Sequence, residues 1–154
     1  MVLRVANLQK AGNPYRKIPE KYLADFEEQG IYHVYNRTNN REKLFLSEEN
    51  RLFFLRKYKE HLSAYLDTYC WCLLPNHFHF LVRVKPLIKI MECIEGKEFN
   101  NRSLTEKKFL TNQCTISELI EHGFRRFFQS YSLAFNKVHQ RKGICFINLS
   151  SGLP

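Results

Sequence analysis

Three short apolar runs along the chain predict β-strands. Residues 31–37, 69–74 and 77–84 are rich in β-branched and aromatic side chains, a composition typical of strands. The Pro-Asn pair at 75–76 separates the last two runs, and the polar segment 38–42 is predicted to be a turn or loop. We therefore expect these three runs to form a sheet.

Two longer segments have apolar residues at helical spacing. Ser47 is a suitable N-cap, followed by acidic residues in the first turn, for a helix that runs to about Leu66. A second helix is predicted from Ser117 onward. The apolar positions are Leu52, Leu55, Tyr58 and Leu62 in the first helix, and Ile120, Phe124, Phe127, Phe128, Tyr131 and Phe135 in the second. The segment 86–115 is expected to be a flexible or basic loop around short helical pieces.

The order of these elements predicts an α+β domain, with an antiparallel sheet covered by helices. A chain of 154 residues corresponds to a single domain. We divide it into an N-terminal arm (1–28), a core (29–144) and a divergent tail (145–154). The arm is polar and contains two prolines, so we expect it to lie outside the hydrophobic core.

The chain is strongly basic, with a formal net charge of +9 and a sequence pI of about 9.4. Such an excess favours a polyanionic partner through phosphate contacts and counterion release. Charge alone does not distinguish DNA from RNA or from an acidic membrane surface. No apolar run approaches the ~20 residues that span a bilayer, and the N-terminus lacks the features of a signal peptide. The five cysteines have irregular spacing, so we expect free thiols, a cytoplasmic location and no membrane association.

The third predicted strand carries two histidines at alternate positions, in the sequence His77-Phe78-His79. Alternate residues of a strand share a face, so Leu81 and Arg83 lie on the same side as the histidines, and Phe78 lies on the core side. Two neighbouring imidazoles with an arginine further along are suited to hold a divalent ion beside a bound phosphate. The alternative is that the two histidines only form surface hydrogen bonds.

A small RNA- or DNA-binding domain with a structural zinc site is a second interpretation of the same histidines. Cys70 and Cys72 alternate on the preceding strand, so the pattern C-x-C-x4-H-x-H could place two thiols and two imidazoles around Zn²⁺. Structural zinc sites usually present cysteines at wider spacing from turns or knuckles. We therefore favour Cys70 and Cys72 as small core residues.

Three segments together resemble one protein family. They are IYHVYNRTNNREKLF (31–45), YCWCLLPNHFHFLVRV (69–84) and FQSYSLAFNKVHQRKG (128–143). Their order and spacing resemble the single-tyrosine HUH transposases, particularly the REP-associated group. "HUH" denotes histidine, bulky hydrophobe, histidine, which here is His77-Phe78-His79 within PNHFH. The resemblance covers roughly residues 28–144.

This resemblance implies a ferredoxin-like sheet with helices packed on one face, and a bacterial, nucleoid-associated DNA transposase. Such enzymes bind hairpin single-stranded DNA and cut next to the hairpin. The resemblance also implies that His77 and His79, with a further ligand, hold Mg²⁺ or Mn²⁺, which polarises the scissile phosphate. A tyrosine hydroxyl then attacks to give a 5′-phosphotyrosine and a free 3′-OH, and rejoining reverses the step.

The nucleophile is the least defined part of the predicted site. In the family the tyrosine follows the late helix, in a segment resembling R-Y-I-H-x-N-P-V, and this sequence contains no such segment. We therefore expect a truncated enzyme with a relocated nucleophile, or an inactive remnant that only binds DNA. Tyr131 is the nearest candidate, although its place on the apolar stripe favours a core aromatic, and Tyr32 and Tyr35 are ambiguous. Loss of a covering helix would expose apolar area, which favours a homodimer.

Polar and basic side chains are predicted to bind the DNA. We assign this role to Asn36, Arg37, Arg41 and Arg83 near the histidines, and to Arg125, Arg126, Lys137, Arg141 and Lys142 on and after the late helix. As a group they should make DNA binding strongly salt-dependent. The alternative for the five late cations is an ordinary solvated helix face.

Overall fold

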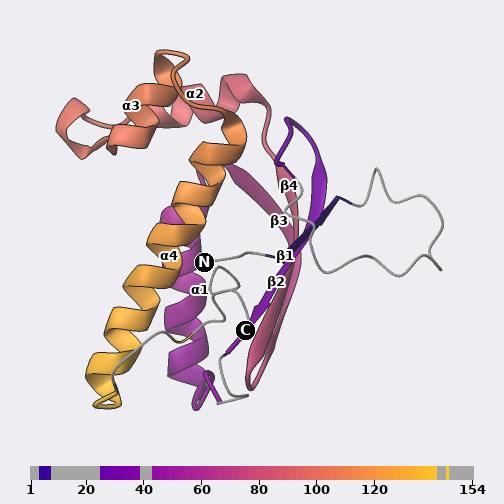
Figure 1. Ribbon diagram of the computed structural model, residues 1–154, viewed down its shortest axis with the longest axis vertical. Coiled ribbons are helices and arrows are strands. Elements are labelled where there is room, and N and C mark those ends of the chain that lie inside the picture. Colours follow the sequence, from indigo (N-terminus) through magenta and orange to yellow (C-terminus); the bar gives the residue numbers. More distant parts are fainter. Residues whose placement is uncertain (1–3, 8–24, 39–42, 142–144, 146–154) are drawn as a thin grey trace, which may run out of the picture.

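An antiparallel sheet forms one layer of the molecule, and helices cover one of its faces (Figure 1). The computed structural model describes residues 4–7, 25–38, 43–141 and 145. The strands are β1 (Arg4–Asn7), β2 (Ile31–Arg37), β3 (Leu66–Leu74) and β4 (His77–Val84), arranged in the order β1-β2-β4-β3. The helices are α1 (Glu48–Leu62), α2 (Leu87–Glu95), α3 (Leu104–Leu110) and α4 (Ile116–Val138), with a 3-10 turn at Phe99–Asn101.

Side-chain caps explain where α1, α3 and α4 begin. Ser47 precedes α1 and accepts a hydrogen bond from the backbone of its first turn. Ser103 forms a capping box with Glu106 at the start of α3, and Thr115 forms one with Glu118 at the start of α4. These bonds satisfy backbone N–H groups that have no partner within the helix. The predicted cap at Ser47 is therefore confirmed.

Strict alternation along β4 separates the core from the open face of the sheet. Phe78 and Phe80 are fully buried and point toward the helices. The ring of Phe80 lies 4.1 Å from that of Tyr58 on α1, and the ring of Phe78 lies 5.6 Å from that of Phe128 on α4. Because aromatic side chains bury the most apolar area of any residue type, these contacts fix which face of the sheet the helices cover.

The predicted α+β class, with an antiparallel sheet and helices on one face, is confirmed. The elements β2-α1-β3-β4-α4 follow the order of the first five elements of a ferredoxin-like β-α-β-β-α-β unit. The edge position beside β2 is taken by β1, which pairs with it antiparallel. Residues 4–7 of the expected N-terminal arm therefore belong to the sheet.

The segment 86–115 has more regular structure than predicted, since it contains α2, the 3-10 turn and α3. Glu106 of α3 attaches this segment to the rest of the domain. Its carboxylate accepts hydrogen bonds from the hydroxyl of Tyr65 and the amine of Lys97. β3 also begins at Leu66, earlier than the predicted Tyr69, and α1 ends at Leu62.

Candidate metal and DNA-binding site

The candidate site lies on the open face of the sheet, opposite the helices. β2 contributes His33, Tyr35 and Arg37, and β4 contributes His77 and His79; we call these five residues the histidine face. The strand register places Tyr35 opposite His79, and Arg37 opposite His77. Directly opposed residues on one face of an antiparallel pair are close neighbours. Imidazole, phenol and guanidinium groups therefore share one small area of surface.

A hydrogen bond to the preceding residue orients His77. Its Nδ1 lies 2.7 Å from Oδ1 of Asn76. An amide oxygen is only an acceptor, so Nδ1 of His77 carries the proton. In the neutral ring Nε2 is then the nitrogen with a lone pair available to a ligand.

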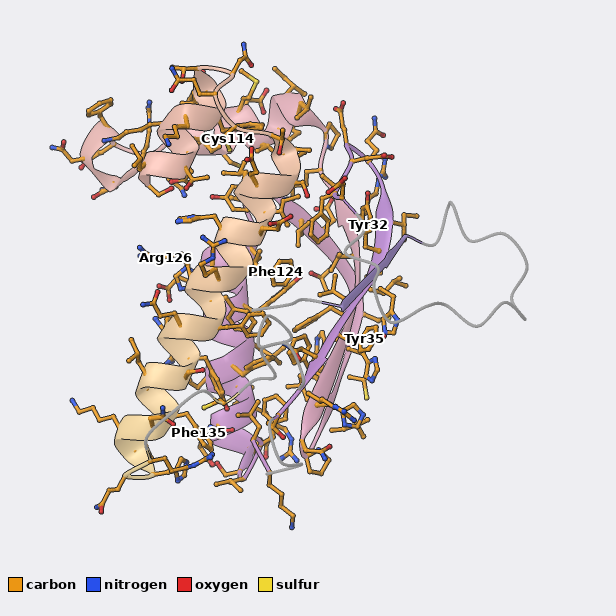
Figure 2. All side chains as sticks on the ribbon, viewed as in Figure 1. Tyr32, Tyr35, Cys114, Phe124, Arg126 and Phe135 are labelled. Atoms are coloured by element: carbon orange, nitrogen blue, oxygen red, sulfur yellow. The ribbon has the colours of Figure 1, made fainter. Side chains whose placement is uncertain are left out.

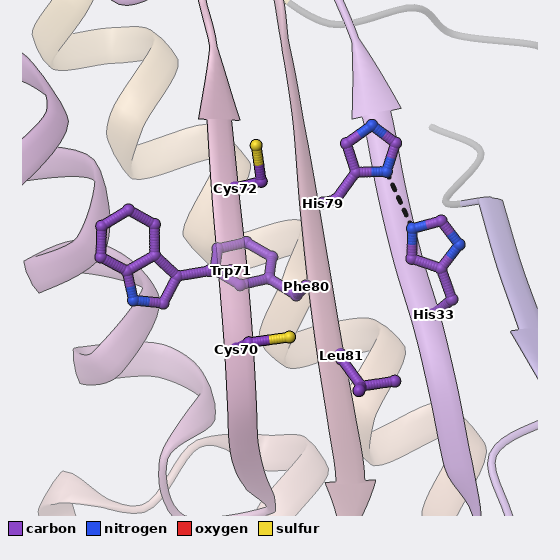
Figure 3. A pocket seen from close by; sticks show the side chains of 7 residues that line it. All are labelled: His33, Cys70, Trp71, Cys72, His79, Phe80 and Leu81. Atoms are coloured by element: carbon purple, nitrogen blue, oxygen red, sulfur yellow. Dashed lines mark hydrogen bonds between the residues drawn. The ribbon is translucent and has the colours of Figure 1, made fainter.

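A hydrogen bond to a neighbouring strand orients His79. Nε2 of His33 lies 2.8 Å from Nδ1 of His79 (Figure 3). The two ring planes differ by 10° and their centroids are 5.0 Å apart. These values describe rings that meet edge to edge, as a hydrogen bond in the ring plane requires. Both histidines of β4 are thus hydrogen-bonded through Nδ1, and neither of these two bonds involves Nε2.

Partial burial favours neutral imidazoles at this site. It lowers the pKa of His33. The pKa of His79 is lowered first by burial and then by the positive charges that His33 and His77 carry when protonated. A lowered pKa favours the neutral ring near pH 7, and the neutral ring is the form that binds metal ions.

His77 and His79 could supply a divalent cation with two imidazole ligands at most. The ring centroids of His77 and His79 are 5.2 Å apart and their planes are nearly perpendicular. Within the part of the chain that the structure describes, no group of three or more His, Cys, Asp and Glu residues could hold a metal ion. Water and substrate phosphate oxygens would complete the shell of Mg²⁺ or Mn²⁺. With so few protein ligands, the affinity is expected to be weak.

Among the described residues, no three or more of the side chains of the alternative zinc site come together as a group that could hold a metal ion. The register places Cys72 opposite His79 and Cys70 opposite Leu81. Both cysteines are exposed, which corrects the prediction that they are core residues. They line a shallow hollow of about 390 Å³ beside the histidine face (Figure 3). The hollow is lined by His33, Cys70, Trp71, Cys72, His79, Phe80 and Leu81.

Tyr131 is a core residue on the far side of the sheet from the histidines. Its side chain is fully buried, and its ring lies 4.9 Å from that of Phe54. Its hydroxyl donates to the carbonyl of Leu44 (3.3 Å) and lies 3.0 Å from Oδ1 of Asn50. Burial raises the pKa of Tyr131, which disfavours the phenolate. The alternative, that Tyr131 is a core aromatic, is therefore confirmed, and its hydroxyl does not lie on the histidine face.

The two tyrosines of β2 have different environments. Tyr32 is fully buried, and its hydroxyl donates to the carbonyl of Asp25 (3.0 Å). Tyr35 lies on the histidine face, with ring centroids 5.0 Å from His33 and 5.7 Å from His79. Of these two, Tyr35 is the tyrosine that shares a surface with the candidate metal ligands.

The polar strand residues that we predicted to bind DNA lie on two different faces. Arg37 is exposed on the histidine face. Arg83 lies further along the same side of β4 and donates to Oε1 of Gln29 (2.7 Å). Asn36 is only 4% exposed and belongs to the helix-covered face. The prediction that Asn36 contacts DNA is corrected, because a buried side chain offers a ligand no surface.

The basic residues of the late helix lie in the other layer of the molecule. Arg125, Arg126 and Lys137 are exposed side chains of α4, Arg141 follows that helix, and Arg41 and Lys142 lie outside the described residues. Figure 2 shows Arg126 on the helix layer and Tyr35 on the sheet layer. The structure therefore does not bring the cations of α4 together with the histidine face.

The sequence pattern did not identify His33 as part of the site. The alternation of side chains along residues 31–37 could have identified it, because it places His33, Tyr35 and Arg37 on one face of the strand. Which strand this face would lie beside depended on the pairing of β2 with β4. Pairing between distant segments is not encoded in the periodicity of either strand.

Comparison with protein-family models, with curated proteins and with solved structures gave no match. Among the helices of the described residues, none is both long and apolar enough to cross a membrane.

Proposed function

We propose that this protein binds hairpin-forming single-stranded DNA on the open face of its sheet, and cuts and rejoins it with the aid of a divalent cation. One observation carries the proposal: His77 and His79 share the open face of the sheet beside Arg37, and the hydrogen bonds that orient the two rings use Nδ1 and leave Nε2 uninvolved. The net charge of +9 supports a phosphate-bearing ligand. The resemblance of PNHFH and its flanking segments to the single-tyrosine HUH transposases supports DNA as that ligand.

The proposed reaction is a phosphoryl transfer to a tyrosine. The phenol oxygen bonds to phosphorus, the bond from phosphorus to the 3′ oxygen breaks, and the proton lost by the phenol is balanced by one gained at the 3′ oxygen. A bound cation would polarise the phosphate, and Arg37, which lies opposite His77, would neutralise charge on the phosphate oxygens. Because the phosphodiester energy is retained in the phosphotyrosine, reversal rejoins the strand without an external energy source.

We propose Tyr35 as the nucleophile. It lies on the histidine face, directly opposite His79 in the strand register. Tyr131 offers a matched control, because it carries the same hydroxyl in the core, on the other side of the sheet. The Phe variants of the two tyrosines each remove one hydroxyl and keep the ring.

Covalent trapping tests this function. The protein is incubated with Mn²⁺ and labelled single-stranded hairpin DNA, and a denaturing gel reveals any covalent adduct. We expect a band that disappears in Tyr35→Phe and His77→Ala and persists in Tyr131→Phe. A band that persists in Tyr35→Phe would exclude this nucleophile, and one that persists in His77→Ala would exclude the metal role.

DNA binding without cleavage is the second candidate function. It is favoured by the core positions of Tyr32 and Tyr131, whose hydroxyls are hydrogen-bonded inside the domain. Hairpin binding by the unmodified protein, with no covalent band in Mn²⁺, would support this second function and contradict the first.

A further inference from the structure

We propose that His33 is a positioning residue of the metal site, which accepts a hydrogen bond from Nδ1 of His79 and thereby keeps Nε2 of His79 as the metal ligand. This inference rests on the proposed metal-dependent function. It adds His33 to the two proposed ligands, His77 and His79, and assigns it the role of hydrogen-bond acceptor for Nδ1 of His79. His33 does not itself contact the cation in this scheme.

The chemistry follows from the two tautomers of imidazole. A neutral imidazole carries one proton, so one nitrogen donates and the other accepts. The 2.8 Å contact between Nε2 of His33 and Nδ1 of His79 requires one of them to be the donor. If Nδ1 of His79 donates, its Nε2 has a lone pair for a cation. If Nε2 of His33 donates, Nε2 of a neutral His79 carries the proton and does not bind metal.

The strand register makes this contact specific to His33. β2 and β4 pair so that His33 is opposite Leu81 and Tyr35 is opposite His79. His33 therefore reaches His79 diagonally, within the range of longer side chains on neighbouring strands. The nearly coplanar rings, 10° apart, place the lone pair of one nitrogen along the N–H direction of the other.

His77, the other proposed ligand, is oriented by a hydrogen bond of the same kind. Nδ1 of His77 is held by Oδ1 of Asn76, which acts as a fixed acceptor. Metal-binding histidines commonly donate their second N–H to an acceptor that sets the tautomer and the ring orientation. At His77 this acceptor is an amide, and at His79 it is the imidazole of His33.

The first measurement is the tautomer of His79 in the metal-free protein. Long-range ¹⁵N–¹H NMR spectra of the labelled full chain distinguish Nδ1–H from Nε2–H. We expect Nδ1–H in the unmodified protein and a mixture of both tautomers in His33→Leu. If His79 carries its proton on Nε2 in the unmodified protein, the inference is overturned regardless of any metal measurement.

The second measurement is Mn²⁺ affinity, followed by electron paramagnetic resonance. Loss of an acceptor that supports a ligand commonly weakens metal binding by about 10–100-fold, so we expect a loss of at least about tenfold in His33→Leu. His33→Gln keeps an acceptor oxygen and should restore most of the affinity. His122→Leu, on α4 and outside the histidine face, is the matched control and should bind Mn²⁺ as the unmodified protein does.

The outcomes separate this inference from the proposed function. An unmodified protein that binds no Mn²⁺ contradicts the proposed function, whereas the tautomer of His79 still decides whether His33 orients it. If the unmodified protein binds Mn²⁺ and His33→Leu binds it equally well, the positioning role is wrong. If His33→Leu does not fold, two measurements still test the positioning role of His33. They are the tautomer of His79 in the unmodified protein and the Mn²⁺ affinity of His33→Gln.

Discussion

Glu106 shows how its neighbours set the behaviour of a single side chain. It is 3% exposed, yet its carboxylate accepts hydrogen bonds from Tyr65, from Lys97 and from the backbone N–H of Ser103. Burial by itself raises the pKa of Glu106, but these hydrogen bonds outweigh it and hold the pKa below its ordinary value of 4.5. The charged form is therefore the one that the fold stabilises.

At this residue we predict acid-sensitive stability. A carboxyl group with a lowered pKa in the folded state stabilises the fold above its unfolded pKa, and that contribution is lost as the pH falls below about 4.5 toward the folded pKa. In Glu106→Gln, the free energy of unfolding should be lower at neutral pH and should fall less between pH 5 and 3. Urea unfolding across this range measures the slope. Parallel curves for Glu106→Gln and the unmodified protein would show that Glu106 does not supply this dependence.

The pairing of α1 with α4 depends on a glycine. Gly123 is buried within α4, where glycine is unfavourable for an isolated helix by about 1 kcal/mol relative to alanine. A Cβ at this position would lie 3.0 Å from Cδ2 of Leu62, 3.2 Å from the backbone oxygen of His61 and 3.3 Å from the ring of Tyr65. The close approach of the two helices therefore explains the glycine.

Gly123→Leu should destabilise the domain by about 2–3 kcal/mol, because overpacking at a helix contact displaces backbone as well as side chains. Gln129→Leu introduces the same side chain at an exposed position of the same helix and should change stability by less than about 0.5 kcal/mol. Urea unfolding gives both values. Equal stabilities of the two variants would mean that α1 and α4 do not pack closely at Gly123.

At the scale of the whole molecule, the two layers separate two basic surfaces. Arg37 is exposed on the histidine face, and Arg126 is exposed on α4 in the helix layer. If DNA binds at the histidines as we propose, a single strand would contact the first surface and not the second. The two arginines therefore form a charge-matched pair for locating the DNA.

Arg37→Ala should weaken binding of a hairpin oligonucleotide by about 3–10-fold and reduce the slope of log K against log salt by about 1. Arg126→Ala removes the same charge and should change the affinity by less than about twofold. Fluorescence anisotropy at several salt concentrations measures both. If Arg126→Ala is the weaker binder, the DNA lies on the helix layer and the proposed site is misplaced.

Periodicity predicted the strands β2, β3 and β4 and the helices α1 and α4. The alternation of β4 identified Phe78 as core and placed His77 and His79 together on the other face, as the structure shows. The apolar stripe of α4 correctly favoured Tyr131 as a core aromatic. The helices of segment 86–115 were not predicted in detail, because short helices depend on tertiary contacts such as those of Glu106 for their stability.

The sequence by itself determined which residues could share a face, because a strand repeats every two residues and a helix every 3.6. It therefore predicted the strands β2, β3 and β4, the core side of β4 and the place of the two histidines together on its other side. Only the tertiary structure decided which residues from other segments would join them. The bond between His33 and His79 links positions 46 residues apart, and the sheet that carries it separates Tyr131 from the same site. Such relations depend on strand register and layer packing, which local periodicity does not specify.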